Sequence, residues 1–190
     1  MQAQETTAAG ESGMAAVRRL GDRTLRLLKT DLTELDVDAF VFYAQHDLVL
    51  GAGFGNMITV RGGPTIQKEL KGHEPVQTCD VVLSDAGELK ARHIIHAVGP
   101  RFREPHTEDK LRLTMRNVLD LAREKGVKTL AFPPMGTGFY GIPLDLSARV
   151  MCEEIERCLA GDTTLEEVSI CVMDKREWTP FHERIAGGAA

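Results

Sequence analysis

The chain has 190 residues, of which 43% are hydrophobic and 27% charged, a composition typical of a globular domain that buries its own core. Its 23 Lys and Arg against 28 Asp and Glu leave a net charge of −5, which argues against broad binding of nucleic acid through its phosphates. No apolar run reaches membrane-spanning length, no apolar leader precedes a cleavage site, and none of the four cysteines forms a Cys-x-x-Cys pair, so we expect a cytoplasmic protein with reduced thiols and no membrane partner.

The first part of the chain is predicted to be rich in strands. Residues 1–20 are expected to form a flexible tail, because this segment begins with small polar residues that lack apolar periodicity. Residues 24–29 alternate weakly and predict an edge strand, whereas 37–44 are almost continuously apolar and predict a central strand. The stretch GAGFGN at 51–56 predicts a glycine-rich loop, and a helix is expected over 57–70.

The second part alternates strands with helices. Residues 107–125 carry apolar side chains at helical spacing and predict an amphipathic helix with Thr107 as its N-cap. Short apolar stretches bounded by Gly, Pro or polar residues predict strands. The remaining expected elements are strands at 76–84, 92–98, 127–132 and 167–173, a helix from Leu144, and a closing helix over 177–185.

This order of elements predicts one domain over residues 21–186. Strands that alternate with helices form a mainly parallel sheet, because each crossover helix packs on the sheet and returns the chain in the same direction. The predicted fold class is therefore α/β, a three-layer α/β/α sandwich with a mixed, mainly parallel central sheet of about six strands.

The stretch FPPMGTGFYGIP at 132–143 joins a buried strand to a helix. Gly136, Gly138 and Gly141 give the backbone freedom in φ and let a ligand approach it closely. Residues 134–143 contain no Lys or Arg, so the free N–H groups and the positive helix end predict an anion site made from backbone. The alternative is an ordinary strand-to-helix turn.

The GAGFGN loop at 51–56 also follows an apolar strand and precedes a helix. It is not a P-loop, because no Gly-Lys-Ser/Thr follows, and not a dinucleotide fingerprint, because Asn56 occupies the last glycine position. Ligands of open α/β sheets bind beyond the carboxyl ends of the strands, where two such loops can face each other. Two facing loops rich in amide groups suit a diphosphate.

Three stretches, in this order, resemble the macro domain family. TDLTELDVDAFVF at 30–42 is similar to the family's opening segment, RHIIHAVGP at 92–100 to its Ile-Ile-His-Ala-Val-Gly-Pro strand, and FPPMGTGFYGIP to its second ligand loop. The resemblance covers roughly residues 22–185. It implies the macro domain fold and binding of ADP-ribose, free or attached to a macromolecule, with no metal and no cofactor.

The resemblance also implies the ligand contacts. The Asp31 carboxylate would accept a hydrogen bond from the adenine amino group, although an Asp in a turn commonly bonds its own backbone. Met173 stands where the family often has an aromatic residue over adenine, Gln45 and Tyr140 would lie by the distal ribose, and Phe139 would flank the site or pack in the core. The expected ligand-binding set is Asp31, Leu32, Gln45, Gly51, Ala52, Gly53, Phe54, Gly55, Pro134, Met135, Gly136, Thr137, Gly138, Phe139, Tyr140 and Met173.

Two departures from the family's pattern concern catalysis. The usual Asn-Ala-Ala-Asn segment reads Phe42-Tyr43-Ala44-Gln45 here, so the amide of Gln45, the candidate catalytic residue, lies one methylene further from the backbone. Hydrolases of one subclass carry an Asp in the first glycine-rich loop, where this chain has Gly55, which supplies no general base. We therefore expect weak or absent ADP-ribosyl hydrolase activity.

Three functions stay open at this point. The first is a module that binds ADP-ribose or an ADP-ribosylated macromolecule. The second is an enzyme of the same fold that removes ADP-ribose, or the acetyl group of O-acetyl-ADP-ribose, with a water activated by the substrate's own phosphate. The third is a module for poly(A) or RNA ends; the net charge of −5 and the lack of an aromatic-basic stripe argue against it, so nucleic acid is expected only as a modified substrate.

Overall fold

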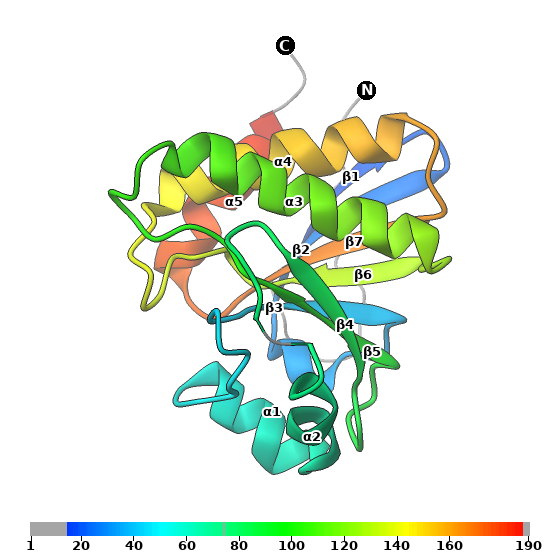
Figure 1. Cartoon of the computed structure of the whole chain (residues 1–190). Coiled ribbons are helices and arrows are strands. Elements are labelled where there is room, and N and C mark those ends of the chain that lie inside the picture. Colours follow the sequence, from blue (N-terminus) through cyan, green and yellow to red (C-terminus); the bar gives the residue numbers. More distant parts are fainter. Residues whose placement is uncertain (1–14, 74, 188–190) are drawn as a thin grey trace.

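The computed structural model describes residues 15–73 and 75–187, in which seven strands form one sheet between two layers of helices (Figure 1). The strands are β1 (Ala15–Leu20), β2 (Arg23–Lys29), β3 (Ala39–Tyr43), β4 (Val81–Asp85), β5 (His93–Ala97), β6 (Thr129–Phe132) and β7 (Glu167–Val172). The helices are α1 (Phe54–Gly62), α2 (Thr65–Leu70), α3 (Thr107–Glu124), α4 (Leu144–Ala160) and α5 (Lys175–Gly187), with a 3₁₀ turn η1 (Leu32–Glu34).

The sheet has the strand order β1-β2-β7-β6-β3-β5-β4. The two outer pairs, β1 with β2 and β4 with β5, are antiparallel, whereas every pairing between β2 and β5 is parallel. The expectation of a mixed, mainly parallel sheet is confirmed. Because β2, β7, β6, β3 and β5 run in one direction, their carboxyl ends meet at one edge, where open α/β sheets bind ligands.

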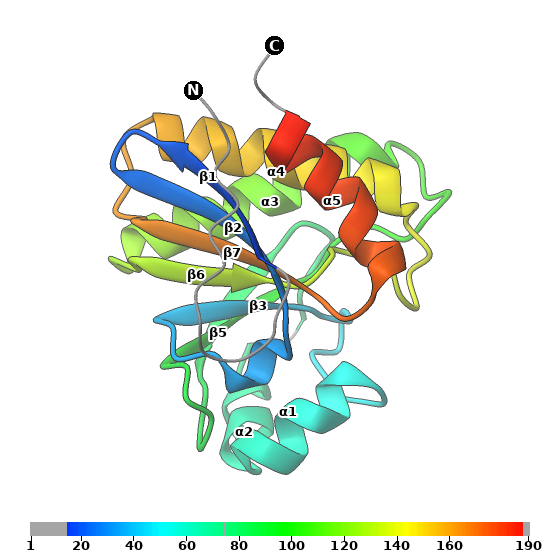
Figure 2. The same ribbon diagram turned by 180° about the vertical axis from the view of Figure 1, so that it is seen from behind.

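The helices form two layers, with α3, α4 and α5 on one face of the sheet and α1 and α2 on the other (Figures 1 and 2). The buried strand β3 serves both cores, because successive side chains point to opposite faces. Val41 and Tyr43 pack in the core beneath α3, α4 and α5, whereas Phe40 and Phe42 face the core beneath α1 and α2. The three-layer α/β/α sandwich expected from the sequence is therefore confirmed.

The main correction lies at the N-terminal edge of the sheet. Residues 15–20, expected in the tail, form β1, and Gly21 with φ +65° closes the tight turn that pairs β1 antiparallel with β2. The strand expected at the edge, β2, thus has neighbours on both sides, and the sheet gains its seventh strand. Arg18 and Arg19 interrupt the apolar pattern of β1, which is why the sequence alone did not indicate a strand. Residues 1–14 lie outside the described residues.

The helix expected over 57–70 consists of two helices. Gly63 with φ +80° and the following Pro64 end α1 and start α2, because proline cannot continue an α-helix through its interior. Helix α1 also begins at Phe54, inside the stretch expected to be a loop. The cap expected at Thr107 is wrong: His106 occupies the cap position, and the Thr107 hydroxyl donates to the Glu104 carbonyl instead.

Candidate functional site

Four strand ends lie in a row at the carboxyl edge of the sheet. Asp31 follows β2, Met173 follows β7, Pro133 follows β6 and Gln45 follows β3. Neighbouring strands are about 4.8 Å apart, so the three steps from β2 to β3 place the strand ends before Asp31 and Gln45 about 14 Å from each other. An elongated ligand can therefore extend along this edge from Asp31 to Gln45.

These strand ends and the two glycine-rich loops border one cleft of about 780 Å³, a size typical of small-molecule sites. Every residue of the expected ligand-binding set lines this cleft except Met135. Contact of these residues with a ligand stays a prediction. The Met135 side chain is fully buried in the core beneath α4, and its backbone carbonyl accepts the Ser147 hydroxyl at 2.9 Å. Phe139, for which core packing was the alternative, is 85% exposed at the rim.

Sequence reasoning missed several residues that line the cleft. Phe42 and Tyr43 lie at the end of β3, and their apolar character indicated only a buried strand. The sequence predicts a closing helix that starts at Glu177, and no motif links this helix, or the preceding Arg176, to the loops. Their proximity arises because β7 ends beside β2 in the sheet. The full set of missed residues is Thr30, Phe42, Tyr43, Val49, Met57, Pro133, Cys171, Arg176 and Glu177.

The first loop, residues 51–55, is short and directly precedes α1. Gly53 has φ +65° and occupies the cap position of α1, and Ala52 and Gly53 are exposed. The N–H groups of the first helical turn lack partners within the helix, so α1 presents them with the positive end of its dipole to the cleft. Gln67 of α2 supports this loop from behind by accepting the Leu50 backbone N–H at 2.7 Å.

The second loop, residues 134–141, is anchored more firmly. Gly136 has φ +72°, and a Cβ there would lie 2.5 Å from Ile142 Cδ1 and 3.1 Å from the Tyr43 ring. The Ile142 N–H donates to the Gly136 carbonyl at 2.9 Å, and the Phe102 N–H donates to the Tyr140 carbonyl at 2.9 Å. By contrast, nothing lies within 4 Å of a Cβ built on Gly138. The loop is therefore rigid at Gly136 and open at Gly138.

Helix α4 begins at Leu144, as expected from the sequence. However, it starts after Gly141, Ile142 and Pro143, and the residues of its first turn do not line the cleft. Phe54 and Gly55 in the first turn of α1 do line it. The positive helix end thus belongs to the first loop, while the second loop contributes irregular backbone.

Asp31 is both a turn residue and a lining residue. Its Oδ1 accepts the Thr33 backbone N–H at 3.0 Å and the Thr33 hydroxyl at 2.7 Å, and its Oδ2 accepts Arg61 Nη1 at 2.8 Å. Partial burial acts to raise the pKa of Asp31, but the bonds from Thr33 and the Arg61 guanidinium outweigh it and hold the pKa below its ordinary value. Asp31 is therefore a charged acceptor, and its Oδ2 keeps a lone pair for a donor in the cleft.

Two tyrosines lie beneath the second loop. The Tyr43 hydroxyl donates to the Pro100 carbonyl, and its ring centroid lies 4.7 Å from that of Tyr140. Gly99 gives the phenol room, since a Cβ there would lie 2.2 Å from the Tyr43 oxygen. The Tyr140 hydroxyl is buried and has no hydrogen-bond partner among residues 15–73 and 75–187. Buried hydroxyls are normally paired, so this one is available to a ligand.

Gly55, which supplies no general base, lies in a crowded part of the first loop. A Cβ at Gly55 would lie 3.2 Å from the Phe42 ring and 3.2 Å from the Leu50 backbone carbon. Phe42 also contacts the Phe54 ring, with centroids 5.9 Å apart. The Phe42 ring thus fills space that a side chain at position 55 would need.

The family model described as Macro domain matches residues 43–151, more than half of the chain. The chain belongs to the macro domain family. A macro domain-containing protein of Caldanaerobacter subterraneus is 36% identical over 83% of this chain and 93% of that protein. A protein of Pantoea vagans named O-acetyl-ADP-ribose deacetylase 1 is 31% identical over 82% of this chain and 95% of that protein.

Solved structures agree with this assignment. A macrodomain of Oceanobacillus iheyensis with MES bound matches with a TM-score of 0.86 at 25% identity, over 91% of this chain and 96% of the other. A Trypanosoma brucei macrodomain in complex with ADP-ribose matches with a TM-score of 0.78 at 27% identity, over 84% and 68% of the two chains. The family resemblance and the fold class expected from the sequence are both confirmed.

In this macro domain, the charged side chains of the cleft follow β2 and β7. They are Asp31, Arg176 and Glu177, whereas the ends of β3 and β6 contribute the phenols of Tyr43 and Tyr140. Burial raises the pKa of both phenols, so both stay protonated and neutral. Among the described lining residues, no carboxylate lies at the β3 end, where the amide of Gln45 is found.

We also searched the described part of the chain for a metal site and for a membrane-spanning helix. Its residues include no cluster of three or more His, Cys, Asp or Glu that could hold a metal ion. Across residues 15–73 and 75–187, no helix combines the length and apolar character needed to cross a bilayer.

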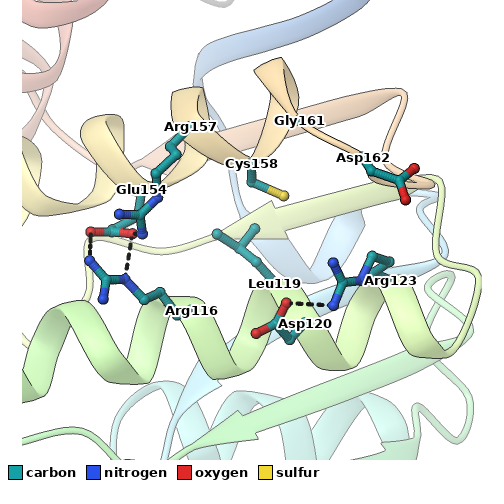
Figure 3. A pocket seen from close by; sticks show the side chains of 9 residues that line it. All are labelled: Arg116, Leu119, Asp120, Arg123, Glu154, Arg157, Cys158, Gly161 and Asp162. Carbon is teal, nitrogen blue, oxygen red and sulfur yellow. Dashed lines mark hydrogen bonds and ion pairs between the residues drawn. The ribbon is translucent and has the colours of Figure 1, made fainter.

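A second groove, of about 400 Å³, lies between α3 and α4 (Figure 3). Arg116 donates to the buried carboxylate of Glu154 at 3.1 Å, and Arg157 pairs with the same carboxylate. Arg123 pairs with Asp120 at 3.0 Å. Each of these guanidinium groups has a carboxylate partner, and Arg116 and Arg157 share that of Glu154, so the groove contains a network of ion pairs that joins two helices.

Proposed function

We propose that this macro domain binds ADP-ribose, either free or as a modification of another molecule. Adenine would lie beside Asp31 and Met173, the diphosphate between the two glycine-rich loops, and the distal ribose beside Gln45 and Tyr140. One observation carries the proposal: a single cleft brings Asp31 and both loops together along four adjacent strand ends. The related macrodomain of Trypanosoma brucei in complex with ADP-ribose supports it.

The chemistry of the cleft suits each part of this ligand. A charged carboxylate at Asp31 can accept a hydrogen bond from an exocyclic amino group. Helix α1 directs its positive end and its free N–H groups toward the space between the loops, as anions require. The buried Tyr140 hydroxyl, which lacks a partner among the described residues, can pair with a ribose hydroxyl.

A thermal-shift measurement with ADP-ribose and AMP tests the proposal. Ligand at a hundred times its dissociation constant adds roughly 2.7 kcal/mol to the free energy of unfolding. For a chain of this size that raises the melting temperature by about 5–10 °C. AMP offers one phosphate and no distal ribose, so we expect a much smaller rise. No shift with millimolar ADP-ribose would count against binding, and an equal shift with AMP would show that the loops do not hold a diphosphate.

A charge placed in the second loop tests where the diphosphate lies. Gly138 is exposed and has open space at its Cβ, so Gly138→Glu should fold normally and repel the ligand's phosphates. Gly138→Gln is the matched control, since it has the same size without the charge. We expect a loss of at least tenfold in affinity for Gly138→Glu beyond that of the control. Equal affinity of the two variants, with unchanged melting, would place the phosphates elsewhere.

The second candidate function is hydrolysis of an ADP-ribose derivative, which the relative named O-acetyl-ADP-ribose deacetylase 1 favours. In this chain the β3 end of the cleft carries no carboxylate among its described residues, and Gly55 is crowded by Phe42. A general base would then have to come from the substrate's own phosphate, with Gln45 as the residue that orients the water.

Turnover of mono-ADP-ribosyl protein and of O-acetyl-ADP-ribose separates the two candidates. We expect weak or no turnover by the wild type and a higher rate for Gln45→Asn if any is present, because the shorter side chain moves the amide by one methylene. Displacements on that scale change rates by about a hundredfold. Efficient turnover by the wild type that is unchanged in Gln45→Ala would show that Gln45 does not govern activity.

A further inference from the structure

The row of strand ends continues past the cleft. Strand β5 lies on the other side of β3 and runs parallel to it, so residues 98–106 after β5 are one strand further from Asp31 than Gln45 is. The hydrogen bond from the Phe102 N–H to the Tyr140 carbonyl fixes this segment beside the second loop. Figures 1 and 2 both show the loop before α3 next to the loop before α4. A group attached to the ribose end of the ligand would emerge toward this segment.

The hydrogen bond between Phe102 and Tyr140 brings residues 101–103 beside the segment that carries Phe139, and we name Arg101, Phe102, Arg103 and Phe139 the distal patch. Phe139 is 85% exposed and Phe102 is 44% exposed, so both rings offer apolar surface to a partner. Arg101 and Arg103 are exposed, and neither has a carboxylate partner within the described part of the chain. The Arg103 guanidinium carbon lies 5.6 Å from the centroid of the Phe102 ring, and this cation–π contact holds it in place.

The carboxylates near the distal patch are engaged elsewhere. Glu104 pairs with Lys110 and accepts the Arg101 backbone N–H at 3.1 Å. Asp47 accepts the Val49 backbone N–H at 3.0 Å. The charges of Arg101 and Arg103 are therefore available to an anionic partner, although the whole chain carries a net charge of −5.

We propose that the distal patch binds the nucleic acid strand of an ADP-ribosylated single-stranded nucleic acid, a proposal that rests on the proposed function of the cleft. Guanidinium groups match pairs of phosphate oxygens, and an exposed aromatic ring such as Phe139 can stack on a base. A nucleotide uses both chemistries at once, whereas an acidic peptide would use the arginines and leave the aromatic face uncovered. Arg101, Phe102 and Arg103 are consecutive in the sequence, whereas Phe139 belongs to the second loop, which the hydrogen bond between Phe102 and Tyr140 brings beside them.

The experiment compares three ligands by fluorescence anisotropy or calorimetry. They are free ADP-ribose, ADP-ribose joined through its distal ribose to the 5′-phosphate of a short single-stranded DNA, and ADP-ribose joined to an acidic peptide. We expect the DNA conjugate to bind about tenfold more tightly than free ADP-ribose, with the peptide conjugate close to free ADP-ribose. Two phosphate contacts also predict that the advantage falls about sevenfold between about 50 and 200 mM salt.

The variant Arg101→Gln with Arg103→Gln should lose the advantage of the DNA conjugate and keep the affinity for free ADP-ribose. The matched control is Arg19→Gln, which removes an exposed arginine from the edge strand β1 and should change neither affinity. Equal affinity of the DNA conjugate and free ADP-ribose, or an advantage that survives in the double variant, overturns this inference alone. An advantage for the peptide conjugate alone assigns the patch to a protein partner and overturns it too. If free ADP-ribose fails to bind, the proposed function falls and this inference falls with it.

Discussion

The two glycine-rich loops face each other across one cleft, but they are built differently. The second loop is held by hydrogen bonds to Ile142, Ser147 and Phe102 and has its tightest point at Gly136. The first loop exposes Ala52 and Gly53 and directs the start of α1 into the cleft. One wall of the cleft is thus a fixed backbone surface, and the other is the end of a helix.

Strand β3 explains the difference, because its last two side chains point to opposite faces of the sheet. Tyr43 fills the space beneath the second loop and contacts the position where a Cβ of Gly136 would be. Phe42 packs beneath the first loop against Phe54 and against His96 of β5. Each loop therefore depends on a different core, and substitutions in the two cores should have separable effects.

The largest expected effect is at Gly136. Gly136→Ala places a Cβ within 2.5 Å of Ile142 Cδ1 in a backbone conformation with φ +72°, which L side chains rarely adopt. Strain and overpacking together should lower the free energy of unfolding by about 2–4 kcal/mol, as measured by urea denaturation. Gly138→Ala is the control in the same loop, and its open Cβ space predicts a change within about 0.5 kcal/mol. Similar losses for both variants would contradict the contrast between the two positions.

The next largest effect is expected at His96, which packs against Phe42 of the core beneath α1 and α2, and it depends on pH. His96 is fully buried, its Nε2 lies 2.8 Å from the Ser84 hydroxyl oxygen, and burial together with the nearby His73 lowers the pKa of His96 to about 3. Between pH 6.5 and 3 the unfolded chain binds a proton that the folded chain excludes, so stability falls as pH falls. From pH 6.5 to 5.0 this contributes a loss of about 1–2 kcal/mol.

The measurement is the difference in pH dependence between the wild type and His96→Gln, which keeps a polar partner for Ser84. Groups that titrate equally in both proteins cancel in this difference. We expect the wild type to lose more stability than the variant over this range. Parallel curves would mean that His96 binds a proton in the folded state.

The smallest expected effect separates the Tyr43 ring from its hydroxyl. Tyr43→Phe keeps the ring beneath Gly136 and removes the donor to the Pro100 carbonyl, so the free energy of unfolding should fall by about 1 kcal/mol. Affinity for ADP-ribose should stay within about threefold, because the ring that supports the second loop is retained. A large loss of affinity without a loss of stability would mean that the hydroxyl itself contacts the ligand.

Much of this molecule could be read from local sequence. The alternation of apolar strands with amphipathic helices predicted the α/β class. Apolar residues recur with a different spacing in a helix than in a strand, and this spacing can be recognised within one segment. The two glycine-rich loops could also be predicted, because turn residues determine the backbone conformation of only a few neighbouring positions. With the macro domain resemblance, these local signals identified most of the residues that line the cleft.

The tertiary structure alone decided which side chains of a loop face the ligand and which face the core. Met135 and Phe139 are both apolar and four residues apart, yet Met135 is buried and Phe139 is exposed. Burial depends on what packs on the other side, and for Met135 that is helix α4. The hydrogen bond between Phe102 and Tyr140 is of the same kind, because it joins segments whose proximity is set by strand order and by no local pattern.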